Sequence, residues 1–186
     1  MMTSPLAPDR APVGDIAAAL TVLDTRLKSI GSGEAAGEDE LRSRYLESFG
    51  PLGAAAVLDG ACTLIYVYMQ WLEDAYSSQD EDVMEHVVPW VLGTMKLMKV
   101  VDDEGIPTMA ALLVAPVVGI SPTLWRREHG PWRKEEMTAL EVAMVLLGLR
   151  VNELTGDDDS AVRLITDLLD QFEADDEAGD EADDGA

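Results

Sequence analysis

One long stretch, residues 52–77, limits most strongly what this chain can fold into. When it is read at the helical repeat of 3.6 residues, it carries one narrow polar stripe, and the rest of its circumference is apolar. The stripe consists of Asp59, Thr63, Tyr66, Gln70, Glu73 and Ser77. A helix on a protein surface needs apolar residues on one side only, so a helix that is apolar on most sides must be surrounded by other helices. The stretch therefore predicts the central helix of an all-α domain.

The segments around this helix supply the other helices of the predicted bundle. Apolar residues recur three and four positions apart, which is typical of helices with one buried face, and proline and glycine mark their ends. Asp15 and Asp80 are the expected N-caps of two of these helices, and Gly156 is the expected C-cap of another. The expected helices span 15–31, 38–49, 81–101, 107–114, 122–129, 132–154 and a final segment that follows 157–159 and ends at 172. We therefore expect an irregular all-α bundle of about six to seven helices around the central helix at 52–77, in a single domain of residues 13–172.

Both ends of the chain have compositions that do not favour a packed core. Residues 1–12 contain three prolines and little to bury, which predicts a flexible arm. From residue 173 to 186, eight of the fourteen residues are acidic and none is basic. Such a composition is typical of disordered chain, so residues 173–186 are predicted to be a disordered acidic tail.

The charge of the chain narrows the choice of partners. It has 36 acidic and 13 basic residues, for a net charge of −23. A surface of that sign repels nucleic-acid phosphates and anionic membranes, and it favours basic partners or a salty cytoplasm. Residues 106–125 contain no charge, but three prolines interrupt them, so we expect no membrane span. With no secretory signal at the N-terminus, the expected location is the cytoplasm. Cys62, the single cysteine, is expected to be a buried thiol.

One short segment of this acidic chain is basic, and we call residues 125–134 the basic segment. Arginine beside tryptophan suits a ligand that bears carboxylate or phosphate, or the centre of a protein interface. The candidate residues are Trp125, Arg126, Arg127, His129, Trp132, Arg133 and Lys134. Two alternatives compete with this interpretation. The cations can complement the dipole of the 122–129 helix while the tryptophans pack in the core, or the segment can bind the chain's own acidic tail.

A second group of residues raises the question of metal binding. Glu81, Asp82 and Glu85 come close to the EExxE pattern with which all-α nucleotide pyrophosphatases hold Mg²⁺, and Asp102 follows at a suitable distance. The second acidic pair of such a site is incomplete, because Lys99 occupies the position of its glutamate. A small Mg²⁺-dependent hydrolase of nucleotides or diphosphates is therefore the alternative function. Otherwise we expect no catalytic residues, no metal and no cofactor.

The leading functional hypothesis is a non-enzymatic, acidic, helical module for protein–protein interaction, such as an adaptor, an assembly chaperone or a regulatory subunit. Its protein partner is expected to be basic or helical. Nine methionines support this hypothesis, since methionine is common at adaptable binding surfaces. A homo-oligomer is also possible, because the helix at 15–31 has an apolar face and is followed by a glycine-rich linker.

Overall fold

The computed structural model describes residues 10–32 and 50–183, and this part of the chain contains helices and turns but no strand. The predicted all-α class is confirmed. The helices are α1 (Val13–Ser32), α3 (Gly50–Ser77), α4 (Val83–Leu97), the short 3-10 helix η1 (Asp103–Gly105), α5 (Ile106–Val117), α6 (Pro122–Glu128), α7 (Lys134–Thr155) and α8 (Ser160–Asp183). The helix expected at 38–49 and most of the linker before it lie outside the described residues, as do residues 1–9 of the expected arm and residues 184–186.

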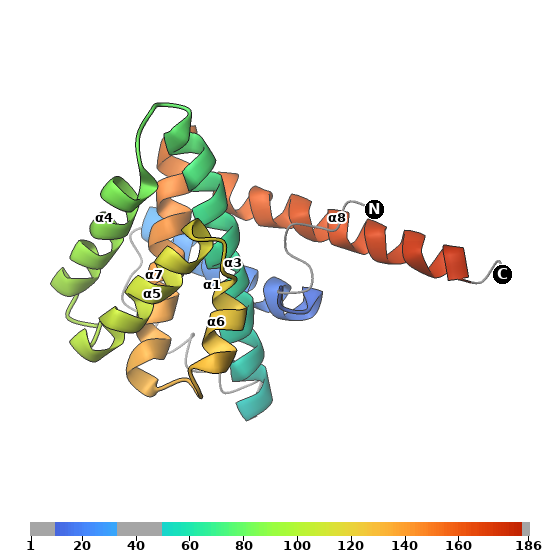
Figure 1. Ribbon diagram of the computed structural model, residues 1–186, viewed down its shortest axis with the longest axis horizontal. Coiled ribbons are helices and arrows are strands. Elements are labelled where there is room, and N and C mark those ends of the chain that lie inside the picture. The colour runs from blue at the N-terminus through green and yellow to red at the C-terminus, as the bar shows by residue number, and fades with distance from the viewer. Residues whose placement is uncertain (1–9, 33–49, 184–186) are drawn as a thin grey trace.

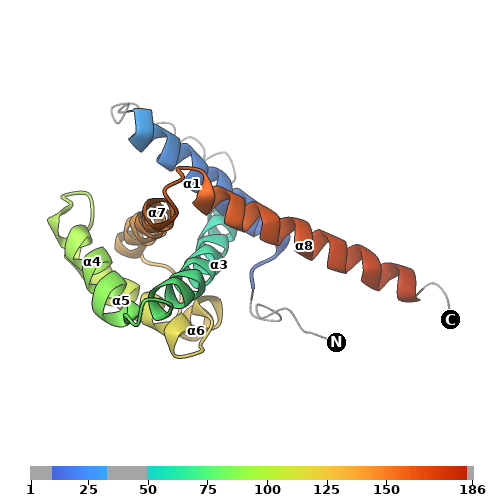
Figure 2. The same cartoon turned by 90° about the horizontal axis from the view of Figure 1, so that it is seen from above.

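Helix α3 occupies the centre of the bundle, as its apolar circumference predicts (Figures 1 and 2). It contacts α1, α4, α5, α6, α7 and α8, and Leu64, Ile65 and Tyr68 on it are fully buried. Residues of the polar stripe of α3 also form hydrogen bonds with other segments of the chain. Thr63 is 2% exposed and accepts a hydrogen bond from the backbone N–H of Ala11. The Gln70 amide donates to the carbonyl of Pro116 at 2.9 Å. The stripe thus satisfies polar groups of neighbouring segments as well as facing water.

The chain before α1 is packed more firmly than its composition indicates. We expected a flexible arm through residue 12, but Ala11 is fully buried and the Arg10 guanidinium lies 4.1 Å from the centre of the Phe172 ring. Helix α1 begins at Val13, before the expected cap Asp15, because the carbonyl of Pro12 already accepts the N–H of Asp15 at 3.0 Å. The arm prediction is therefore wrong for residues 10–12.

Helix α1 lies so close to α3 that only glycine fits at one position of the contact. A Cβ atom at Gly60 would overlap the backbone carbonyl of Asp15. The apolar face of α1, including Ile16, Leu23 and Leu27, is buried in the core of its own chain. The face that we considered for contact with another subunit is therefore occupied internally.

The start of α4 differs from the prediction in its capping residue. The side chain of Asp82 accepts the N–H of Met84 at 2.8 Å and caps the helix. Asp80, the expected cap, has a φ of 61° and lies in the turn that precedes it. Asparagine and aspartate tolerate this left-handed conformation better than most residues do. At the end of α7, the expected C-cap Gly156 is confirmed, with a φ of 70°.

The charge-free stretch 106–125 forms α5 and most of α6 rather than one long helix, because Pro122 begins a new helix after the Ser121 cap. None of the described helices combines the length and the apolar character that a bilayer crossing requires.

Helix α8 extends beyond the body of the molecule (Figures 1 and 2). We expected disorder from residue 173, but the helical backbone continues to Asp183. Among the residues of this helix whose side chains the structure describes, 160–175, Phe172 is the last that is buried. Extension of an existing helix adds one hydrogen bond per residue and needs no new nucleus, so a helix can continue past its last core contact.

Candidate functional site

The basic segment is organised around a buried ion pair. Arg126 on α6 and Glu136 on α7 have side chains that are 6% and 4% exposed, and Nη2 of the arginine lies 2.9 Å from Oε2 of the glutamate. The hydroxyl of Thr108 on α5 donates to Oε1 of Glu136 at 2.7 Å. These three side chains therefore link α5, α6 and α7 through one carboxylate.

Neighbouring groups of the basic segment complete the surroundings of this pair. The Arg126 guanidinium lies 4.1 Å from the centre of the Trp132 ring and donates to the carbonyl of Pro131. Arg133 donates its backbone N–H to Oε2 of Glu136 at 2.9 Å, and its guanidinium lies 3.2 Å from Oε1. Arg126 and Trp132 thus make their contacts within the protein, and Arg126 is too deeply buried to bind a ligand at the surface.

These contacts determine the protonation of Glu136. Burial alone raises the pKa of this carboxyl. The backbone N–H of Arg133, the Thr108 hydroxyl and the Arg126 guanidinium outweigh burial and lower the pKa of Glu136 to about 2. The carboxylate is therefore ionised at neutral pH, and the pair is a true ion pair.

The remaining residues of the basic segment lie apart from this pair. The Trp125 and His129 rings stack with their centres 3.8 Å apart, and Nδ1 of His129 lies 2.6 Å from the carbonyl oxygen of Trp125. Arg127 and Lys134 are exposed. The seven candidate residues therefore do not form one cationic surface, and most of their contacts stabilise the α6–α7 connection.

The four acids of the alternative metal site do not converge. Glu81, Asp82 and Glu85 lie at the start of α4, whereas Asp102 follows its far end and caps η1 by accepting the N–H of Glu104 at 2.9 Å. The fifteen residues of α4 place the two ends about 22 Å apart at a rise of about 1.5 Å per residue. Within the described residues, no group of three or more His, Cys, Asp or Glu side chains could hold a metal ion.

Some of these acids instead line a pocket of about 470 Å³ between the end of α3, the start of α4 and the end of α5, which we call the acidic pocket. Val83, Met84 and Val117 supply its apolar lining, and Ser77 is also at its wall. Of the residues that the structure describes, Glu73, Asp80, Glu81 and Asp82 contribute carboxylates to the lining, and no basic side chain does.

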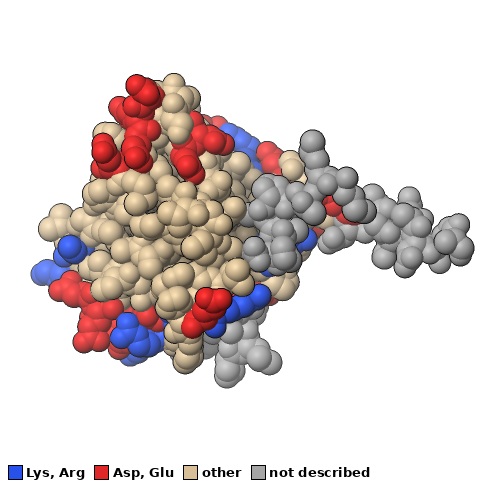
Figure 3. All heavy atoms as spheres, viewed as in Figure 1, with Lys and Arg blue, Asp and Glu red and all other residues tan. Residues whose placement is uncertain are grey.

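The exposed surface of residues 106–125 forms what we call the uncharged face. Its large exposed side chains are Val118, Ile120 and Leu124, which are 62%, 44% and 41% exposed. They lie where α5 ends and the chain turns at Gly119, with a φ of 80°, into α6. Figure 3 shows a broad area without charged side chains over α5 and α6, with acidic side chains above it and mixed charges below. The face adjoins the acidic pocket at Val117.

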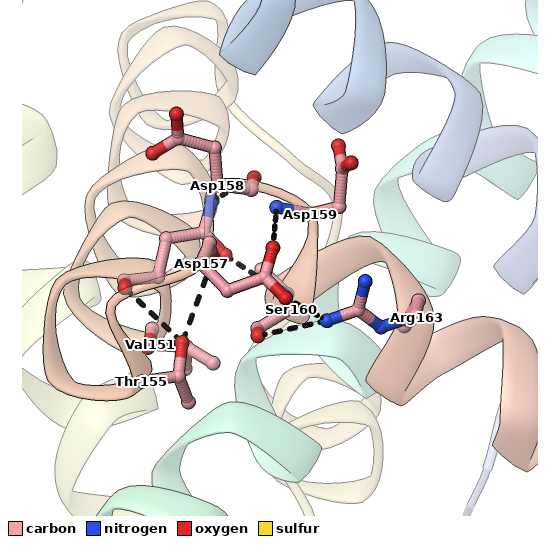
Figure 4. Close-up of polar contacts among 9 residues, drawn as sticks. Val151, Thr155, Asp157, Asp158, Asp159, Ser160 and Arg163 are labelled. Atoms are coloured by element: carbon pink, nitrogen blue, oxygen red, sulfur yellow. Dashed lines mark hydrogen bonds and ion pairs between the residues drawn. The ribbon is translucent and has the colours of Figure 1, made fainter.

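The junction of α7 and α8 also gathers polar residues, and Figure 4 shows them. Asp157 accepts the N–H of Asp159 at 3.0 Å and pairs with Arg163, which also reaches the Ser160 hydroxyl at 3.3 Å. The Thr155 hydroxyl donates to the carbonyl of Val151 at 3.0 Å. These bonds satisfy the end of one helix and the start of the next, so this group is a structural joint.

A cleft of about 620 Å³ lies beside this joint, between α1, α7 and α8. Several of the charged and polar side chains at its wall already have partners in the chain. Lys28 pairs with Asp24 at 2.6 Å, and the Asn152 side chain accepts the N–H of Ala161 at 2.7 Å. The cleft is therefore a weaker candidate than the uncharged face.

Comparison with models of protein families, with curated proteins and with solved structures finds no match to this chain. The geometry described above is what bears on its function.

Proposed function

We propose that this protein is a non-enzymatic interaction module that binds a protein partner through the uncharged face. The observation that carries the proposal is the exposure of Val118, Ile120 and Leu124 within twenty charge-free residues of a chain with a net charge of −23. A contiguous exposed apolar patch is characteristic of an interaction site. Its burial against a partner contributes about 25 cal/mol per Å² of apolar surface.

The support beneath the face favours binding without rearrangement. Leu124 lies on the same short helix as Arg126, which is anchored to Glu136 on α7, and Thr108 anchors α5 to the same carboxylate. The two helices that carry the face, α5 and α6, are therefore held together by the buried carboxylate of Glu136. A surface that is ordered before binding loses less entropy in the complex.

The proposal is tested by affinity capture from lysate of the source organism at moderate salt, with the full chain as bait. Leu124→Asp places a charge in the uncharged face. Leu154→Asp is the matched control, because Leu154 on α7 is 38% exposed and Leu124 is 41% exposed. We expect the wild type and L154D to retain the same partner, identified by mass spectrometry, and L124D to lose it. Circular dichroism checks that both variants fold. Equal retention by all three baits would contradict the proposal.

A further inference from the structure

We infer that the bound partner segment carries a basic side chain, lysine or arginine, that enters the acidic pocket while its apolar side chains cover the uncharged face. This inference rests on the proposed function and adds the chemistry of the partner.

Continuity of the two surfaces is the first argument. Val117 lines the acidic pocket, and the next residue, Val118, is the most exposed large side chain of the uncharged face. A segment that lies on Val118 therefore has the mouth of the pocket beside it. The apolar lining at Val83, Met84 and Val117 suits the methylene chain of a lysine or arginine, while the carboxylates surround its charged end.

The charge of the pocket is the second argument. Asp82 is engaged in capping α4, and Glu73 accepts a long hydrogen bond of 3.4 Å from Gln70. Asp80 and Glu81 are exposed and form no ion pair with any residue that the structure describes. Four carboxylates and no basic side chain stand in the described lining of the pocket, so a cation from a partner meets only opposite charge there. Charge complementarity of this kind fixes the register of a complex and speeds association.

The resulting occupant is a short protein segment with apolar residues next to a lysine or arginine. An acidic or phosphorylated segment would be repelled by both the pocket and the net charge of −23. The polarity of the complex follows, with the basic residue towards the α3–α4 turn and the apolar residues towards α6.

A phage-displayed library of random sixteen-residue peptides, selected on the full chain and depleted on L124D, tests this inference. We expect the surviving peptides to combine apolar residues with lysine or arginine. The enriched peptide is then measured by fluorescence anisotropy against the wild type and against the double variant Glu73→Gln/Glu81→Gln. Loss of two partly exposed ion pairs should weaken binding about fivefold to tenfold, and less at high salt.

The control is Asp170→Asn/Glu173→Gln, which removes the same charge from exposed positions of α8. We expect this control to bind the peptide with nearly wild-type affinity. Peptides that depend on Leu124 but show no preference for basic residues, or that bind E73Q/E81Q as tightly as the wild type, would overturn the inference and leave the proposed function standing. Failure to obtain any peptide that depends on Leu124 would overturn both.

Discussion

The ion pair between Arg126 and Glu136 provides the sharpest test of the support beneath the uncharged face. Removal of one partner of a buried pair leaves the other charge unsatisfied and costs about 3–5 kcal/mol. The whole domain is expected to be stable by only about 5–15 kcal/mol. Either single substitution should therefore remove a large share of the free energy of unfolding.

The two single variants are not expected to be equal. Glu136→Gln leaves the Arg126 guanidinium buried without a counter-charge, and its remaining partners are neutral: the amide oxygen of the new glutamine, the Pro131 carbonyl and the face of Trp132. Arg126→Met leaves Glu136 with three hydrogen-bond donors, from Thr108 and from the backbone and side chain of Arg133. We expect E136Q to lower the free energy of unfolding by about 5 kcal/mol and R126M to lower it by about 3 kcal/mol. The loss in the double variant should be smaller than the sum of the two single losses, and the difference should be about 0.5–3 kcal/mol.

Urea denaturation, followed by tryptophan fluorescence and circular dichroism, measures these differences. The control is Arg127→Met, which makes the same change at the exposed neighbouring arginine and should alter the free energy of unfolding by no more than about 0.5 kcal/mol. Losses below about 1 kcal/mol in both R126M and E136Q, or strict additivity in the double variant, would refute the description of a desolvated pair.

Three further predictions concern the packing and the pH response. Gly60→Ala should lower the free energy of unfolding by about 1–3 kcal/mol, because its Cβ overlaps the Asp15 carbonyl, whereas Gly93→Ala, in open space on α4, should not destabilise the protein in thermal melts. The pKa of Glu136 is lowered from 4.5 to about 2, so its stabilising contribution is complete above pH 4.5 and is lost as the pH falls towards 2. The difference in stability between the wild type and E136Q should therefore shrink over that interval of an acid titration, and a constant difference would contradict the assignment. Tyr68→Phe should cost about 1–3 kcal/mol in urea, because the phenol donates at 2.8 Å to a buried carbonyl at the start of α8, and an unchanged midpoint would argue against that bond.

Local signals in the sequence were sufficient for most of the fold. The apolar circumference of residues 52–77 predicts a central helix because burial on all sides requires neighbours on all sides, and α3 has them. Proline and glycine act on their own backbone, so the start of α6 at Pro122 and the end of α7 at Gly156 were predicted correctly.

The arrangement of charges could not be predicted in the same way. Asp80 and Asp82 are two residues apart and equally suited to cap a helix, and only the path of the turn decides which carboxylate reaches the first N–H groups. Arg126 belongs to a segment that looks like a surface patch, and its burial depends on Glu136 and on Thr108, which comes from another helix.

The acidic pocket could not be predicted either, because its residues are still farther apart in the sequence. It joins Glu73 to Val117, which are far apart in the sequence and meet only after α3, α4 and α5 have packed. The charge-free stretch 106–125 was recognised, but its composition alone does not say which of its side chains remain exposed. Acidic residues on both sides of the turn between two helices, as at Glu73 and at 80–82, are the signal that could have indicated the pocket.

The projection of α8 has a consequence for how the molecule moves in solution. The eleven residues 173–183 continue the helix about 16 Å beyond Phe172 at a rise of about 1.5 Å each. A body with such a rod attached experiences more friction than a sphere of equal mass. A monomer of 20.1 kDa should therefore elute from a sizing column ahead of globular standards of its mass and resemble a larger assembly. Sedimentation equilibrium, which depends on mass and not on friction, would give the monomer value.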